Sequence, residues 1–304
     1  MIWSPVQREW FIYYTARRAT RKKATYVGTP LGVISSSDLI NWRFRGYCTL
    51  ADTNGDPRKG KPDNDDTHWA PGVIVAGDHL HMFATYKSSA TPPWGGNGKI
   101  RHYVAPLSDP IDGWQLVESP EFNQPDPIDV SLLKTDNEYR AYYRVGKGGG
   151  IQWATSSDLI TWKNQGKCAG AVNGKHRGFG YQEAPYVFYF QDRFWMLTDP
   201  HKGLAVFHSD DGVDWQQQDR ILAEPGQAKT DATLARHPSV AVLDDQAFIF
   251  YHTEPNRPYP TPPAERRTPH QKISFLQMAE LKVEDGALTC DRDHKVKNDH
   301  NVKN

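Results

Sequence analysis

The sequence predicts an all-β protein folded as a five-bladed β-propeller, and three observations lead to this prediction. A hairpin pattern recurs five times, a short turn ending in tryptophan recurs four times, and 304 residues include 24 glycines and 22 prolines, which supply turns. A single copy of the repeat could not bury both of its faces, so the copies must pack against one another. A β-sandwich or a pair of unrelated β domains is the alternative.

The hairpin pattern opens each predicted blade. In every copy an apolar strand leads into a turn, and a strand rich in aromatic residues follows. The five copies are residues 2–15, 70–86, 129–145, 184–198 and 237–253. Five openings indicate five blades.

A second repeat marks the outer half of the blades. SSDLINW at residues 36–42 returns as SSDLITW at 156–162, and looser copies stand at 108–114 and 209–215. Serine and aspartate suit such a turn because their side chains bond to nearby backbone N–H groups. Each copy lies between two further extended segments, and residues 273–290 complete the fifth blade with the turn EDG. The two repeats together predict four strands per blade.

These repeats place residues 1–291 in a single propeller, the predicted catalytic domain. Residues 292–304 contain almost no apolar side chains and are predicted to form a flexible tail. The three cysteines lie far apart and form no C-x-x-C motif. This spacing indicates small buried or half-buried thiols rather than a disulfide framework or a zinc site.

Charge and composition limit the partners. The chain has 36 Lys and Arg against 36 Asp and Glu, so no overall charge attracts nucleic acid or an anionic membrane. No stretch approaches the roughly 18 to 20 apolar residues of a membrane helix, and no signal peptide is evident. Ten tryptophans suit sugar binding as well as a core. An oligosaccharide or polysaccharide is the predicted partner, whereas oligomeric state and compartment do not follow from the sequence.

Propeller geometry identifies the candidate site. The first strand of each blade lines the central channel, so the residues just before its apolar run converge at one face. Two carboxylates that meet there beside tryptophan and histidine suggest glycoside hydrolysis, although each carboxylate alone would more commonly cap a turn or pair with arginine. The candidates are Asp66, His68, Trp69, Asp129, Glu183 and His237.

Three of the opening segments resemble the inner-strand motifs of glycoside hydrolase family 43 and of related five-bladed propeller enzymes of clan F. They are HWAPGVIV at 68–75, PIDVSLLKTDNEYRAYY at 127–143 and YQEAPYVFYFQDRFWMLT at 181–198. The resemblance covers nearly the whole chain in order. It implies an inverting glycosidase that requires no cofactor, with Glu183 as general acid and Asp129 as the residue that orients this acid and tunes its pKa.

The resemblance also implies a general base, an aspartate that opens blade one, but only Met1 precedes Ile2 here. We expect a missing N-terminal segment, because propellers usually close their ring with a strand from the opposite terminus. Asp66 is the best substitute base within the chain. Its alternative role is a rim residue that binds a sugar hydroxyl.

Two further positions are interpreted through the resemblance. His237 matches a histidine that contacts a cation or water on the propeller axis, which implies a structural Ca²⁺ or another cation there. A purely structural histidine is the alternative. Gly72 stands where many relatives have glutamate, and this departure leaves room in the channel.

We expect the long connections between blades to determine the substrate specificity. The longest are residues 16–30, 51–67, 87–99 and 253–272, and their bulk indicates a pocket and therefore exo action. Trp94 is a candidate sugar-stacking platform, with a buried anchor as the alternative. His68, Trp69 and His237 complete the predicted substrate-binding set. By resemblance, the substrates are plant or algal polysaccharide fragments cleaved by an arabinofuranosidase, xylosidase or galactose-type activity, outside the cytoplasm or in the periplasm.

Two other functions stay open. The first is a non-catalytic carbohydrate-binding propeller that lacks the general base and uses Asp129 and Glu183 to bind sugar hydroxyls. The second is a retaining fructan hydrolase. The second would need Asn-Asp-Pro-Asn, Arg-Asp-Pro and Glu-Cys motifs, and the sequence has none of them.

Overall fold

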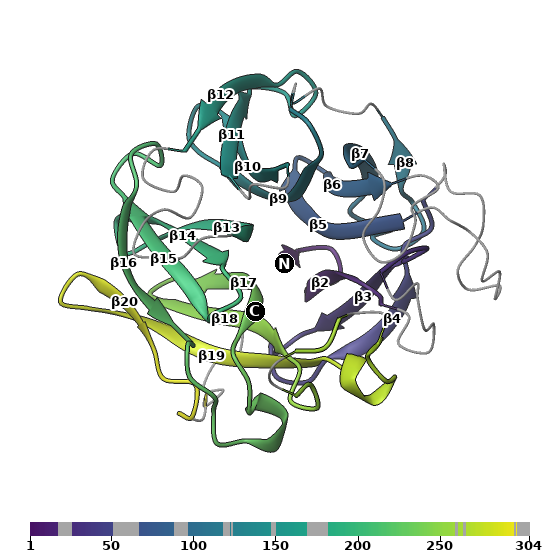
Figure 1. Cartoon of the computed structure of the whole chain (residues 1–304). Helices are drawn as coiled ribbons and strands as arrows, with labels where there is room; N and C mark the ends of the chain where they lie inside the picture. The colour runs from purple at the N-terminus through teal and green to yellow at the C-terminus, as the bar shows by residue number, and fades with distance from the viewer. Residues whose placement is uncertain are drawn as a thin grey trace.

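The computed structural model describes residues 1–17, 26–50, 67–87, 97–117, 122, 124–146, 150–168, 182–258, 261–263, 266–294 and 296. Within them, five four-stranded antiparallel sheets surround a central axis as the blades of a propeller (Figure 1). The predicted fold class is confirmed and the β-sandwich is excluded. No helix in this described part of the chain has the length and apolar character needed to cross a membrane.

Every blade is one continuous run of chain whose strand order equals the sequence order. Blade one contains β1 (Ile2–Ser4), β2 (Glu9–Thr15), β3 (Leu31–Ser36) and β4 (Arg43–Tyr47). Blade two contains β5 (Thr67–Ala76), β6 (His79–Lys87), β7 (Lys99–Pro106) and β8 (Gln115–Leu116). Blade three contains β9 (Pro127–Lys134), β10 (Tyr139–Val145), β11 (Gly150–Ser156) and β12 (Lys163–Lys167).

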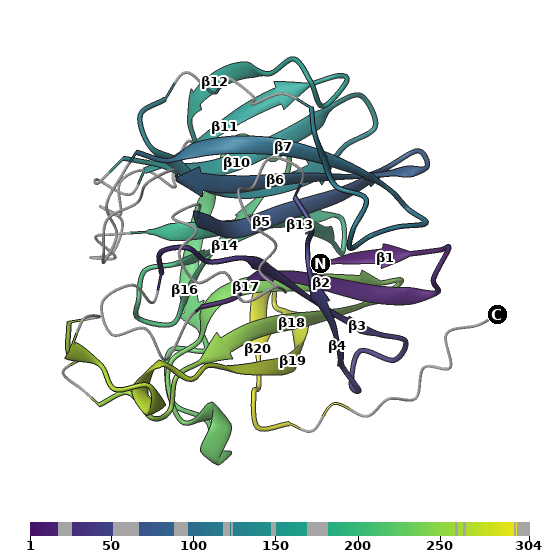
Figure 2. The ribbon, with the colours of Figure 1, turned by 90° about the vertical axis from the view of Figure 1, so that its right-hand side faces the viewer.

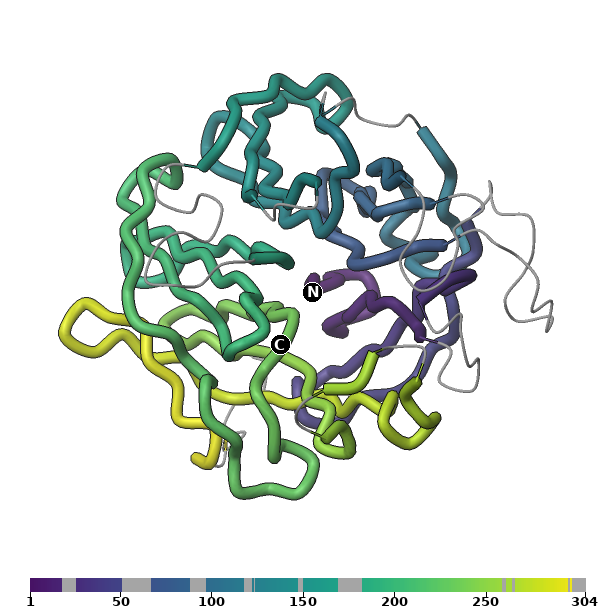
Figure 3. The backbone as a smooth tube through the Cα atoms, viewed as in Figure 1, coloured from purple at the N-terminus to yellow at the C-terminus, as the bar shows by residue number. Residues whose placement is uncertain are grey.

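Blade four contains β13 (Glu183–Phe190), β14 (Arg193–Asp199), β15 (Leu204–Ser209) and β16 (Gln216–Ile221). Blade five contains β17 (Arg236–Leu243), β18 (Gln246–Thr253), β19 (Phe275–Glu284) and β20 (Ala287–Cys290). The 3₁₀ helices η3 (Lys229–Asp231) and η5 (His270–Lys272) lie in connections. The inner strands labelled in Figure 1 lie nearest the axis and the fourth strands lie outside. Figure 3 traces the same arrangement as a backbone tube, and Figure 2 shows the blades from the side.

The tryptophan-ending turns form as predicted. Asp38 Oδ1 accepts hydrogen bonds from the backbone N–H groups of Ile40 at 2.9 Å and Asn41 at 2.7 Å. Trp42 closes the turn by donating from Nε1 to the carbonyl of Leu39 at 2.8 Å. Equivalent aspartate bonds occur in the turns after β11 and β15. The repeated sequence is therefore a hydrogen-bonded connection between the third and fourth strands.

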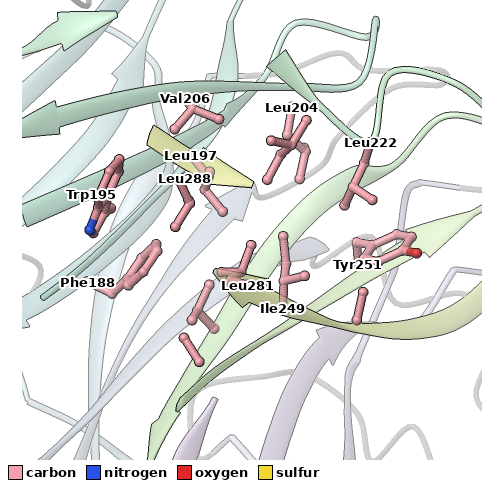
Figure 4. Close-up of a cluster of buried hydrophobic side chains, with 14 of the residues drawn as sticks. Phe188, Trp195, Leu197, Leu204, Val206, Leu222, Ile249, Tyr251, Leu281 and Leu288 are labelled. Atoms are coloured by element: carbon pink, nitrogen blue, oxygen red, sulfur yellow. The ribbon is translucent and has the colours of Figure 1, made fainter. Parts of the chain in front are cut away.

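Apolar side chains fill the spaces between neighbouring blades. Between blades four and five, Trp195 and Leu197 lie in the same cluster as Ile249 and Tyr251 (Figure 4). Burial of such apolar surface is the main term that stabilises a propeller, since isolated blades cannot form a core. Two of the three cysteines are buried and the third is half-buried, as predicted.

Blades one and five close the ring by side-chain packing. Trp42 packs edge-on against Phe250 with ring centroids 5.5 Å apart. The Met1 ammonium group donates to Ser239 Oγ at 3.1 Å. Each described blade is complete within its own stretch of chain. The expected closing strand from the opposite terminus is therefore not found among the described residues.

Ordered structure continues into the segment assigned to the flexible tail. The Arg292 side chain is only 7% exposed and pairs with Asp231, donating from Nε to Oδ2 at 2.8 Å. Gln227 donates its backbone N–H to Asp293 Oδ1 at 2.8 Å. The Arg292 guanidinium also lies 5.2 Å from the centre of the Tyr251 ring, so its partners come from blade five and the preceding connection, which the composition of the tail did not reveal. Residues 297–304 lie outside the described residues.

Gly72 is required by the contact between blades two and three rather than by the channel. A Cβ atom at this position would lie 2.2 Å from the carbonyl oxygen of Val130, and a backbone atom cannot rotate away. We expect Gly72→Ala to lower the free energy of unfolding by about 1 to 3 kcal/mol, the usual cost of overpacking. Urea unfolding of the two proteins measures this difference. Equal stability would show that the blades separate easily at this point.

Candidate active site

The first strands of blades two to five share a backbone irregularity at their opening. Ala70, Asp129, Ala184 and His237 have φ angles of 38°, 58°, 48° and 44°, in the left-handed region that non-glycine residues rarely adopt. Strand pairing shifts register beside each of them, as at a β-bulge. A bulge redirects the side chains around it, and strained backbone of this kind clusters at functional sites. The repeat of one bulge in four blades builds the inner face of the site.

Three of the predicted residues meet at this face. Asp129 from β9, Glu183 from β13 and His237 from β17 each have one oxygen or nitrogen atom within 4.8 Å of those of the other two. They come from three blades and are separated by more than fifty residues along the chain. The convergence expected from propeller geometry is therefore present for these three side chains.

Asp129 joins three blades and is almost fully enclosed. Its backbone N–H donates to Thr85 Oγ1 of blade two at 3.2 Å, and its Oδ2 accepts the backbone N–H of Ala184 in blade four at 3.1 Å. The residue is 5% exposed. Asp129 is thus a carboxyl group fixed behind the site, with little surface available to a ligand.

Three described side chains approach one oxygen of Glu183. His201 Nε2 lies 2.7 Å from Glu183 Oε1, His237 Nε2 lies 3.3 Å from it, and the Arg236 guanidinium donates to it at 3.4 Å. The Glu183 side chain is 14% exposed, so solvent reaches it only in part. Charge-assisted hydrogen bonds of this kind fix the direction of a carboxyl group.

Asp199, at the end of β14, holds two of these donors in place. It is fully buried, its Oδ2 accepts from Arg236 Nε at 2.6 Å, and its Oδ1 accepts the backbone N–H of His201 at 2.7 Å. The backbone N–H of His237 also lies 3.3 Å from Oδ2. One buried carboxylate thereby organises the polar groups around Glu183.

The two carboxyl groups at the axis, Asp129 and Glu183, have pKa values that are shifted in opposite directions. Burial raises the pKa of Asp129 to about 6, the positive charge of His237 opposes this rise, and the negative charge of Glu183 adds to it. Burial also disfavours the charge on Glu183, but hydrogen bonds from His201 and His237 outweigh it and hold the pKa of Glu183 well below its usual range. As the pH falls, Asp129 is therefore the first of the two groups to take up a proton, at about pH 6, and above that pH it carries a negative charge.

His237 is expected to stay protonated throughout the neutral range. Burial lowers the pKa of its imidazole, but the hydrogen bond and charge of Glu183 outweigh burial and raise this pKa to about 9. Because the folded pKa lies above the ordinary value, the stabilisation is present below about pH 6.5 and is lost as the pH rises through about 9. An NMR titration of the histidine ring protons measures this pKa. A midpoint at or below the ordinary value would contradict the described pairing.

Asp129, Glu183 and His237 each offer one ligand atom to a metal ion, all within 4.8 Å of one another. Two carboxyl groups and an imidazole are fewer than the six to eight oxygen ligands that Ca²⁺ takes, so such an ion would need further ligands. The imidazole nitrogen faces Glu183 as a protonated donor, and the Arg236 guanidinium lies beside it. These two cations supply the positive charge that a metal would bring, so no step below depends on a metal.

The other predicted residues have different positions. His68 is 2% exposed and lies inside blade two, where its Nε2 is 3.0 Å from Tyr103 Oη. Trp69 is half-buried, donates from Nε1 to the carbonyl of Tyr26 at 2.8 Å, and has the Lys87 ammonium 4.8 Å from its ring centre. His68 is therefore not a sugar ligand in this arrangement. Asp66 and Trp94 lie outside the described residues.

Sequence reasoning missed three residues that contact Glu183 or hold its partners: His201, Asp199 and Arg236. His201 follows a second strand rather than opening a first one, so the repeat gives no reason to place it at the site. One signal was available. Asp199 and Pro200 interrupt the apolar end of a strand, which is unusual for a buried position.

Comparison with known proteins gives results at the level of structure. No family model matches the sequence, and no curated protein matches it. A thermostable family 43 glycoside hydrolase of known structure is 18% identical, with 97% of this chain and 94% of that chain covered and a TM-score of 0.70. A GH43_1 enzyme from Xanthomonas citri is 15% identical, with 92% and 87% covered and a TM-score of 0.62.

Two further solved structures are also similar to this chain. A GH43 β-1,3-galactosidase bound to galactodeoxynojirimycin is 14% identical, with 93% and 90% covered and a TM-score of 0.62. A GH32 β-fructofuranosidase from Bombyx mori is 14% identical, with a TM-score of 0.65, but this chain covers only 60% of its length. The chain therefore has the five-bladed β-propeller fold of the family 43 glycoside hydrolases.

Proposed function

We propose that this protein is a glycoside hydrolase that removes a terminal sugar from an oligosaccharide or polysaccharide fragment. The observation that carries the proposal is the convergence of Asp129, Glu183 and His237 from three blades at the propeller axis. Glycoside hydrolysis needs a carboxylic acid that protonates the leaving oxygen, held where neighbouring groups control its proton. The similar solved structure that is named as a β-1,3-galactosidase supports this reaction class.

Glu183 is proposed as the general acid and Asp129 as the residue that tunes it. Glu183 is partly exposed, whereas Asp129 is buried and gives one oxygen to the Ala184 N–H group. A group enclosed in this way cannot attack a sugar carbon, which argues against Asp129 as the nucleophile of a retaining reaction. Its position beside Glu183 suits a charge that raises the proton affinity of the acid.

An inverting reaction is proposed, with water activated by a separate carboxylate. In inverting enzymes the acid and base carboxyl groups are roughly 6.5 to 9.5 Å apart, which leaves room for that water. The described clusters of carboxyl groups place Asp129 and Asp199 close to Glu183, and neither lies across such a gap. The base is therefore expected among groups outside these clusters, with Asp66 as the candidate within the chain.

The proposal is tested by hydrolysis of natural oligosaccharides and aryl glycosides, including arabinofuranosides, xylosides, galactosides and fructosides. Release of a single terminal sugar that stops in Glu183→Gln supports an exo-glycosidase with this acid and identifies the sugar. Activity on fructosides alone would favour the fructan-type alternative. Hydrolysis that is unchanged in Glu183→Gln would refute the assignment of the acid.

A non-catalytic sugar-binding propeller is the second candidate, and one observation favours it. His201 and His237 hold the pKa of Glu183 well below its usual range, while a general acid must carry a proton. In this alternative Glu183 accepts hydrogen bonds from sugar hydroxyls and no bond is cleaved. Binding of oligosaccharides with no hydrolysis by the protein would establish this alternative.

A further inference from the structure

We propose that His201 is a positioning residue for Glu183, which orients the carboxyl group so that it can serve the leaving oxygen. The inference rests on the proposed function and adds a residue to its machinery. His201 makes the shortest contact to Glu183, 2.7 Å between Nε2 and Oε1. Arg236 and His237 approach the same oxygen at 3.4 Å and 3.3 Å.

The backbone of His201 is held in an unusual conformation. Its φ angle is 62°, in the left-handed region, and its N–H group donates to the fully buried Asp199. A non-glycine residue in this region costs energy and persists only where the surroundings fix it. Gly203, two residues later, is also constrained. Its φ angle is 81°, and a Cβ atom there would lie 2.4 Å from Ala223 Cα.

This turn delivers an imidazole to Glu183 from a second element of the fold. Arg236 and His237 both belong to β17 in blade five, whereas His201 follows β14 in the same blade as Glu183. Donors held by two separate elements restrict rotation of the carboxyl group more than donors held by one. A general acid misplaced by about 1 Å can lose a large part of its rate advantage, so such restriction has a direct effect on catalysis.

His201 is also the most accessible of these three partners. Its side chain is 48% exposed, compared with 34% for His237 and 20% for Arg236. The role is positional, because the proposal assigns no bond making or proton transfer to His201.

Two variants separate positioning from general damage. His201→Ala removes the imidazole, and His201→Gln keeps an N–H donor of similar reach with a similar backbone cost. His79→Ala is the matched control, since His79 is 46% exposed and lies 2.6 Å from a carboxylate, Asp78, in blade two. All three proteins are compared with the wild type on aryl glycosides of the sugar that the wild type cleaves.

We expect His201→Ala to lower kcat/KM about tenfold for poor leaving groups and little for good ones, with KM nearly unchanged, because only poor leaving groups need a well-placed acid. His201→Gln should regain most of the lost rate, and His79→Ala should match the wild type. Equal loss for all leaving groups, or no loss, would overturn the proposal while leaving the glycosidase assignment intact.

A second measurement needs no substrate. Crystal structures of the wild type and His201→Ala show whether the Glu183 carboxyl group keeps its orientation. A reoriented or multiply placed Glu183 in the variant supports the proposal even if no glycoside is cleaved. An unchanged Glu183 carboxyl group in the variant would refute it, whatever the protein hydrolyses.

Discussion

Glu183→Gln is expected to lower the rate of hydrolysis by roughly 10² to 10⁴ on substrates with poor leaving groups, the usual contribution of general acid catalysis. Glutamine has nearly the same size as glutamate, and its amide oxygen can still accept from His201. The substitution therefore removes the transferable proton and leaves the packing intact. Initial rates on a natural oligosaccharide and on an aryl glycoside with a good leaving group measure the effect.

The comparison between these two substrates is the control for this prediction. A good leaving group needs little protonation, so the variant should lose much less activity on the activated glycoside. Equal losses on both substrates would indicate a disturbed site rather than a missing acid. A variant that retains the wild-type rate on the natural substrate would remove Glu183 from the mechanism.

Asp129→Asn is expected to lower kcat by roughly 10- to 100-fold, the effect of losing one charged interaction worth about 1.5 to 3 kcal/mol. The asparagine carbonyl can still accept the Ala184 N–H group, so the link between blades three and four is retained. The substitution removes the negative charge of Asp129. That charge favours the protonated form of Glu183. KM should change little, because Asp129 is 5% exposed.

Asp78→Asn is the matched control for this second prediction. Asp78 is an aspartate with a 90% exposed side chain in the turn of blade two, outside the site. It should retain full activity. If Asp129→Asn raised KM and left kcat unchanged, Asp129 would be a sugar ligand rather than the residue that tunes the acid.

The fold could be predicted from the sequence because the propeller repeats its local signals. Each hairpin and each tryptophan-ending turn is a short-range feature, and five copies in phase define the architecture. The positions of Asp129 and Glu183 followed from the same repeat, since both open a first strand. A periodic pattern was thus sufficient to predict elements whose structure depends on residues that are close in the sequence.

The partners of Glu183 could not be found in this way. His201 contacts Glu183 from a turn with left-handed backbone, and Arg236 contacts it from the neighbouring blade five. Neither contact follows from strand periodicity. The position of His68 depends on the same local geometry. It precedes the bulged residue Ala70 by two positions, and its side chain lies inside blade two beside Tyr103, which the repeat alone does not reveal.

The most direct test of the central claim is an NMR time course with a natural oligosaccharide that the wild type binds. The account predicts that a terminal monosaccharide appears first as the anomer opposite to the linkage cleaved, and that no sugar is released by Glu183→Gln. Bound oligosaccharide that remains intact with the wild-type protein would contradict the account and establish a sugar-binding propeller.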